Sequence, residues 1–206
     1  MQAEEQPQII LVTPPAPDPQ KFGDVLSGVL DKVEIACLRL SLAAQDADRL
    51  GRMADLCRGI AHARDIAVVI DDHFLVASRH GLDGVHLKDG ARLIRKARAE
   101  LGADAIVGAF CGTTRHDGMN AGEAGADYVA FGPIGPTGLG DGILAERALF
   151  EWWSEMIEVP IIAERGLTRE LVQDFAGVTD FFAIGEEIWA SDDPAGALMD
   201  LTAPLR

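Results

Sequence analysis

Eight short apolar runs alternate with longer amphipathic segments along the chain. The runs are rich in β-branched residues and too short for helices, so they predict strands at residues 9–13, 33–40, 66–70, 84–87, 105–109, 128–131, 161–163 and 180–184. The intervening segments have the apolar spacing of helices packed on one face, at residues 21–30, 46–63, 72–80, 91–101, 116–124, 144–157, 168–175 and 186–201. A helix is therefore predicted after every strand.

Continuous apolar strands are buried on both faces, as in a parallel sheet covered by helices. Eight such units predict an α/β protein made of a single (β/α)8 TIM barrel over residues 1–206, with residues 1–8 as a flexible N-terminus. An open doubly wound sheet is the competing architecture. It rarely has eight strands in so few residues, and no G-x-G-x-x-G motif follows the first predicted strand, so the barrel is favoured.

The net charge of the chain limits the classes of partner that we expect. Thirty-three acidic against 18 basic residues give a net charge of −15, which repels nucleic acid and anionic lipid surfaces. The N-terminus lacks the basic start and apolar run of a secretory signal, and no apolar stretch reaches membrane-spanning length. We expect a small-molecule substrate or ligand, with no nucleic acid and no membrane, and the sequence leaves a homo-oligomer open.

The three cysteines are too far apart to suggest a disulfide framework or a metal cluster. Cys37, Cys57 and Cys111 are scattered singly, as is usual in a reducing compartment. A cytoplasmic location is therefore expected.

Two segments carry a family resemblance. Residues 125–137, GADYVAFGPIGPT, together with residues 81–87, GLDGVHL, resemble the thiamine phosphate synthase family, which includes the thiazole tautomerases. The similarity extends to residues 10–13, 107–108 and 160–163 and so covers most of the chain. It implies a barrel enzyme that joins a pyrimidine-methyl pyrophosphate to a thiazole phosphate with the help of Mg²⁺, a transferase of thiamine biosynthesis.

The resemblance also assigns roles to residues at the C-terminal ends of the predicted strands, where a TIM barrel carries its site. It implies that Arg39 and Asp72 are catalytic and that Asp72 holds Mg²⁺. Asp89 is the nearest replacement for the second metal ligand, although an N-cap of the following helix is the simpler interpretation. The substrate-binding candidates are His86, Gly132, Thr137, Arg165, Gly166 and Gly185.

Several positions depart from the family pattern. A serine, Ser41, stands where the family has a lysine for pyrophosphate, and Phe110 and Gly112 replace a serine and a histidine. Glu186 and Glu187 follow the last strand, where carboxylates repel a phosphate. Because one lost transition-state contact costs about 10²-fold in rate, these changes together predict that the family reaction is nearly abolished. Whether the chain is an enzyme therefore stays open, and the alternatives are a non-catalytic ligand-binding or regulatory relative, or another small-molecule reaction on the same barrel.

Overall fold

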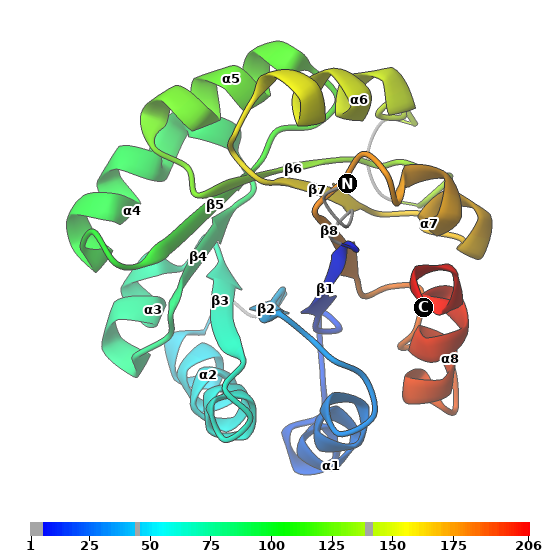
Figure 1. Cartoon of the computed structure of the whole chain (residues 1–206). Helices are drawn as coiled ribbons and strands as arrows, with labels where there is room; N and C mark the ends of the chain where they lie inside the picture. Colours follow the sequence, from blue (N-terminus) through cyan, green and yellow to red (C-terminus); the bar gives the residue numbers. More distant parts are fainter. Residues whose placement is uncertain (1–5, 44–45, 139–141) are drawn as a thin grey trace.

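In the computed structural model, which describes residues 6–43, 46–138 and 142–206, eight parallel strands form a closed barrel in sequence order. The strands are β1 Gln8–Val12, β2 Cys37–Leu40, β3 Ala67–Asp71, β4 Gly84–Leu87, β5 Ile106–Phe110, β6 Tyr128–Phe131, β7 Ile161–Glu164 and β8 Phe181–Ile184. The helices surround them, and α8 lies next to α1 so that the ring closes (Figure 1). The predicted (β/α)8 barrel is confirmed.

The helices occupy the segments where apolar spacing predicts them. They are α1 Pro19–Leu30, α2 Ala47–His62, α3 Phe74–His80, α4 Ile94–Leu101, α5 Arg115–Ala124, α6 Arg147–Met156, α7 Arg169–Phe175 and α8 Pro194–Leu201, with short 3-10 turns at Gly90–Leu93 and Ala203–Leu205. No helix in the part of the chain that the structure describes is long and apolar enough to cross a membrane.

Some element boundaries differ from the sequence expectation. The second strand begins at Cys37 rather than at residue 33, and the last helix begins at Pro194 rather than at residue 186. Asp193 caps that helix by accepting the N–H of Gly196, and proline is preorganised for the first turn that follows. At the N-terminus, Gln8 of the expected flexible segment already belongs to β1, Gln6 and Pro7 precede it, and residues 1–5 lie outside the described residues.

Side chains alternate between the two faces of each strand. One set packs against the helices in a large core, and a smaller set fills the inside of the barrel, including Ile10, Tyr128, Ala130, Ile162 and Ala183. Because the period of a strand is two residues, Arg39 and Glu164 follow inward-facing positions at Cys37 and Ile162 and also point inward. The alternation thus places charged groups at the C-terminal end of the interior.

At the other end of the barrel, three aspartates fix the starts of neighbouring strands. The carboxylates of Asp83, Asp127 and Asp180 accept the backbone N–H groups of Val68, Val107 and Ile161 at 2.6, 2.7 and 2.8 Å. Each of these bonds joins the residue before one strand to the strand beside it, which fixes the register.

Candidate functional site

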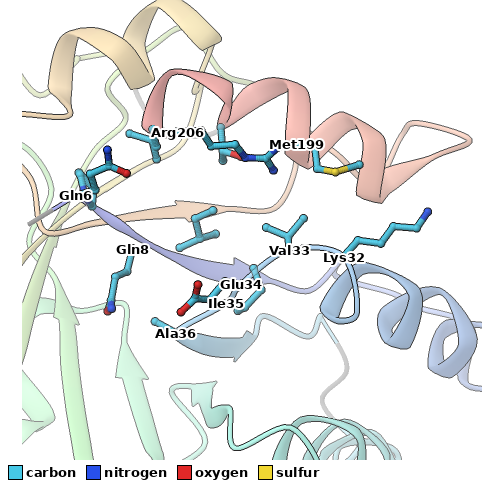
Figure 2. Close-up of a pocket in the computed structure, with 13 residues that line it drawn as sticks. Gln6, Gln8, Lys32, Val33, Glu34, Ile35, Ala36, Met199 and Arg206 are labelled. Carbon is cyan, nitrogen blue, oxygen red and sulfur yellow. The ribbon is translucent and has the colours of Figure 1, made fainter.

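Two pockets open at opposite ends of the barrel. The pocket in Figure 2 has a volume of about 630 Å³ and lies between Gln8 at the start of β1, residues 32–36 before β2 and Met199 on α8. The other has a volume of about 590 Å³ and lies at the C-terminal ends of β1, β2, β3, β7 and β8. Although it is slightly smaller, its walls include Asp71 and Glu164, and one buried oxygen of each lacks a hydrogen bond among the described residues. No described residue with such an atom lines the Figure 2 pocket. We therefore take the C-terminal pocket as the candidate site, as the fold predicts.

A buried ion triad forms the floor of this pocket. Arg39, at 5% exposure, donates from Nε to Asp71 Oδ1 at 2.7 Å and from Nη1 to Glu164 Oε2 at 2.5 Å. Burial alone would lower the pKa of Arg39, but the two carboxylates outweigh it and raise the pKa, so the guanidinium stays charged. Arg39 thus reaches the site as predicted, but two of its nitrogens already bind the chain's own carboxylates.

The second oxygens of the two carboxylates face a different environment. Asp71 Oδ2 and Glu164 Oε1 are buried, and neither receives a hydrogen bond from a described residue. Lys88 Nζ lies 4.0 Å from Asp71 Oδ2, and Arg165 Nε lies 3.1 Å from Glu164 Oε1, so both oxygens have a cation near them. Burial would raise the pKa of both carboxyls, but Arg39 outweighs it and their pKa values are lowered, so both are ionised at neutral pH.

His86 is fully buried beside the triad, as the cross-strand neighbour of Asp71. Its Nδ1 is 2.9 Å from the Tyr128 hydroxyl, the two rings stack, and Nε2 has no hydrogen-bond partner in the described chain. Burial, with the Arg39 charge, lowers the pKa of His86 to about 4, so the ring is neutral near pH 7. With no exposed surface, His86 supports the floor of the site and does not line the open pocket.

The two candidate metal ligands are each engaged with a cation of the chain. Asp72, at a backbone φ of 57°, accepts the N–H of Lys88 at 2.8 Å, and its Oδ2 lies 3.3 Å from Lys88 Nζ. Asp89 stands at the N-cap position but makes no capping bond, and it pairs instead with Arg92 at 3.0 Å. No group of three or more metal-binding side chains occurs within residues 6–43, 46–138 and 142–206. As arranged, these residues do not fit a Mg²⁺ ion.

Backbone amides after β7 and β8 converge on two glutamates. Glu187 accepts the N–H groups of Gly185 at 2.9 Å and Leu167 at 3.1 Å. Glu186 Oε1 accepts the Gly166 N–H at 3.3 Å and the Thr137 hydroxyl at 2.8 Å. The predicted phosphate donors Thr137, Gly166 and Gly185 are therefore brought together, but carboxylates of the chain occupy them.

The other predicted binding residues lie at the edge of the site. Arg165, at a backbone φ of 70°, packs its guanidinium 4.1 Å from the Phe110 ring centroid. The N–H of Gly132 donates to Gly112 O at 3.0 Å, which leaves it committed to the backbone of the β5–α5 loop. Arg165 thus lines the pocket, whereas Gly132 supports the loop behind it.

Sequence reasoning missed several residues of the site. Asp71, Lys88 and Glu164 all line the pocket, although only their neighbours were given site roles from the sequence. The signal was available for two of them, because strand periodicity places Asp71 and Glu164 at inward-facing positions at strand ends. Lys88 directly follows β4, so its end of the barrel could be predicted, but its pairing with Asp72 depends on the loop conformation.

Fold and site together define the class, a (β/α)8 barrel with a small-molecule pocket at the C-terminal ends of its strands. Residues 9–186 match the family described as thiamine monophosphate synthase, TMP-TENI. The chain is 41% identical over 205 residues to the thiamine-phosphate synthase of Rhodospirillum centenum, covering 97% of this chain and 98% of that one. It is 33% identical to the thiamine-phosphate synthase of Hyphomonas neptunium, covering 98% and 95% of the two chains. The chain belongs to the thiamine monophosphate synthase family.

Solved structures agree on the fold. The thiamine phosphate pyrophosphorylase of Pyrococcus furiosus superposes with a TM-score of 0.81 at 19% identity, covering 96% of this chain and 95% of that one. At that identity the likeness shows the barrel alone.

Proposed function

We propose that this protein acts in thiamine biosynthesis by binding a thiamine-related small molecule in the C-terminal pocket, and that it joins the two phosphorylated precursors poorly or not at all. The family membership supports the first part. The observation that carries the second is that Glu186 and Glu187 occupy the amides of Gly166, Leu167 and Gly185, where a phosphate would bind.

Full thiamine phosphate synthase activity is the second candidate. The 41% identity to the Rhodospirillum centenum protein over nearly the whole chain favours it. In this alternative Asp72 holds Mg²⁺, Arg39 and Thr137 steady the pyrophosphate, and the Gly166 and Gly185 amides hold the acceptor phosphate. It requires Lys88 to release Asp72 and both glutamates to leave the amides.

Turnover separates the two candidates. Purified protein is given the pyrimidine pyrophosphate, the thiazole phosphate and Mg²⁺, with the Rhodospirillum centenum relative as the positive control. We expect a rate at least about 10²-fold below the control. Comparable rates, or rescue of a thiamine-requiring host at normal expression, would establish the second candidate instead. A folded sample whose melting temperature responds to no thiamine-related compound would reject the proposal altogether.

The same proposal includes the setting of the protein. All three cysteines are free thiols, and Cys57 and Cys111 are buried, which supports a reducing, cytoplasmic compartment. The net charge of −15 supports a small-molecule partner over nucleic acid. A homo-oligomer stays a prediction.

A further inference from the structure

Resting on the proposed function, we infer the chemical class of the ligand: a flat nitrogen heterocycle that carries no phosphate and donates N–H groups to Asp71 Oδ2 and Glu164 Oε1. The inference comes from what the chain itself places in the pocket. The chain's own glutamates occupy the anion positions, and its own lysine occupies the cation position. Two carboxylate oxygens on the pocket floor keep no hydrogen bond from a described residue.

The anion positions are filled first. Glu187 takes two backbone N–H groups with its two oxygens, and Glu186 takes a third together with the Thr137 hydroxyl. A phosphate at these amides would have to displace both carboxylates, which would then stand beside it as like charges. The backbone amides therefore donate to the chain's own glutamates, and this arrangement disfavours a phosphorylated ligand.

The cation position is filled as well. Lys88 Nζ lies 3.3 Å from Asp72 Oδ2 and 4.0 Å from Asp71 Oδ2, so one ammonium group stands between two carboxylates. An ammonium group there offsets the charge that a divalent ion would otherwise balance. A ligand that arrives as a metal-bound pyrophosphate would have to expel it.

Acceptors remain on the pocket floor. Asp71 and Glu164 are each 2% exposed, and one oxygen of each lacks a hydrogen bond in the described part of the chain. A buried acceptor without a donor is costly, and a ligand N–H that reaches it removes that cost. Arg39 holds both carboxylates through their other oxygens. The nearest cations to the two remaining oxygens are Lys88 Nζ, 4.0 Å from Asp71 Oδ2, and Arg165 Nε, 3.1 Å from Glu164 Oε1, so a ligand N–H would have to enter beside them.

The pocket walls suit a flat ring. Val12, Pro14, Ala183 and Trp189 line it beside the charged floor. Trp189 is held in place because its indole N–H donates to Val12 O at 2.6 Å. An aromatic ring with a polar edge would therefore bury its faces against these side chains while its edge meets the carboxylates.

A matched pair of probes tests the inference. Thiamine has an aminopyrimidine and no phosphate, and thiamine phosphate differs by the phosphate alone. By calorimetry with the full chain, we expect thiamine to bind at least tenfold more tightly than thiamine phosphate. The double variant Glu186→Ala/Glu187→Ala should reverse or abolish that preference, whereas Glu158→Ala, an exposed glutamate before β7, should keep it. Asp71→Asn, which presents an amide to the ligand, should weaken thiamine binding at least tenfold while circular dichroism reports a folded chain.

The outcomes separate this inference from the proposed function. If thiamine phosphate binds the unaltered protein as well as thiamine does, the ligand class is wrong while the place in thiamine biosynthesis stands. If thiamine, thiamine phosphate, the free pyrimidine and the free thiazole all fail to bind, then both the ligand class and the proposed function are wrong. A preference for thiamine that survives the double glutamate variant and is unaffected by Asp71→Asn would refute the assignment to these residues.

Discussion

The two ends of the barrel use aspartates and glutamates in opposite ways. At the N-terminal end, Asp83, Asp127 and Asp180 each accept a backbone N–H of the neighbouring strand. At the C-terminal end, Asp71 and Glu164 are buried and each keeps one oxygen without a hydrogen bond among the described residues. The first set of carboxylates fixes the register of neighbouring strands, whereas the second set retains oxygens that could accept a further hydrogen bond.

Backbone conformation is divided less sharply between the two ends. Two non-glycine residues with positive φ, Asp72 and Arg165, lie directly after β3 and β7 at the C-terminal end. Such conformations cost free energy and persist where the surroundings hold them, commonly at functional sites. A third such residue, Asp65 at φ 56°, lies before β3 at the N-terminal end. Strained residues therefore occur at both ends, and what distinguishes the C-terminal end is that buried carboxylate oxygens without a hydrogen bond, among the described residues, lie there.

Removing the centre of the triad should break the C-terminal end most severely. In Arg39→Met, Asp71 and Glu164 lose the cation that both share, so buried charges are left unpaired. We expect a loss of about 3–5 kcal/mol in the free energy of unfolding, measured by urea denaturation. The matched control Arg92→Met removes an exposed pair with Asp89 and should change stability by less than about 0.5 kcal/mol. Equal effects would mean that the triad has no special role.

The next largest effect concerns pH. His86 is neutral in the folded chain, with its pKa lowered to about 4 from an ordinary value of 6.5. Between these two values the unfolded chain binds a proton that the folded chain does not, so stability falls as pH falls from 6.5 towards 4 and is fully present above 6.5. The full change is about 3 kcal/mol. Denaturation at a series of pH values should show this slope, and His86→Asn should flatten it in that window; an unchanged slope would contradict the assignment.

At the N-terminal end the expected effects are smaller, because the aspartates are near water. Asp180→Ala removes the acceptor of the Ile161 N–H and should cost about 1 kcal/mol of unfolding free energy. The exposed Asp104→Ala serves as the control and should be close to neutral. Ligand affinity should be unchanged in both variants, because neither residue lines the C-terminal pocket. A change in ligand affinity would show that the two ends are coupled.

The smallest effect on stability should come from Lys88→Ala. The Lys88 side chain is 45% exposed and that of its partner Asp72 38%, so breaking their pair should cost less than about 0.5 kcal/mol. Asp71 and Asp72 would then lack their bridging cation, and we expect Mg²⁺ to raise the melting temperature of the variant more than that of the unaltered protein. An identical Mg²⁺ response in both proteins would argue against Lys88 as the bridging cation.

Strand periodicity predicted much of the fold. The bounds of β4 and β6 match the expected residues, because short apolar runs between turn residues leave little freedom. The last helix was placed too early because residues 186–193 combine glutamates and apolar residues in a helix-like order. The structure shows that Glu187 accepts the N–H of Gly185 in a turn and that Asp193 caps the helix, so the helix begins only after residue 193.

The site was harder to predict than the fold. Thr137, Gly166 and Gly185 were placed at the correct end, but Glu186 and Glu187 take their donors through loop conformations that no periodicity encodes. Likewise, the bond from Arg39 to Glu164 spans 125 residues of sequence. The alternation of side chains along a strand predicts whether a charged residue at the strand end points inward. Its ion-pair partner, in contrast, depends on how the barrel closes.

Barrel closure also has a consequence for biosynthesis on the ribosome. The hydrogen bond from Trp189 to Val12 joins residues 177 positions apart, and β1 pairs with β8 in the same region. A nascent chain that lacks these last elements exposes the unpaired edges of β1 and β7, which are sites for aggregation. The earliest strand must therefore wait for nearly complete translation before its final partner emerges.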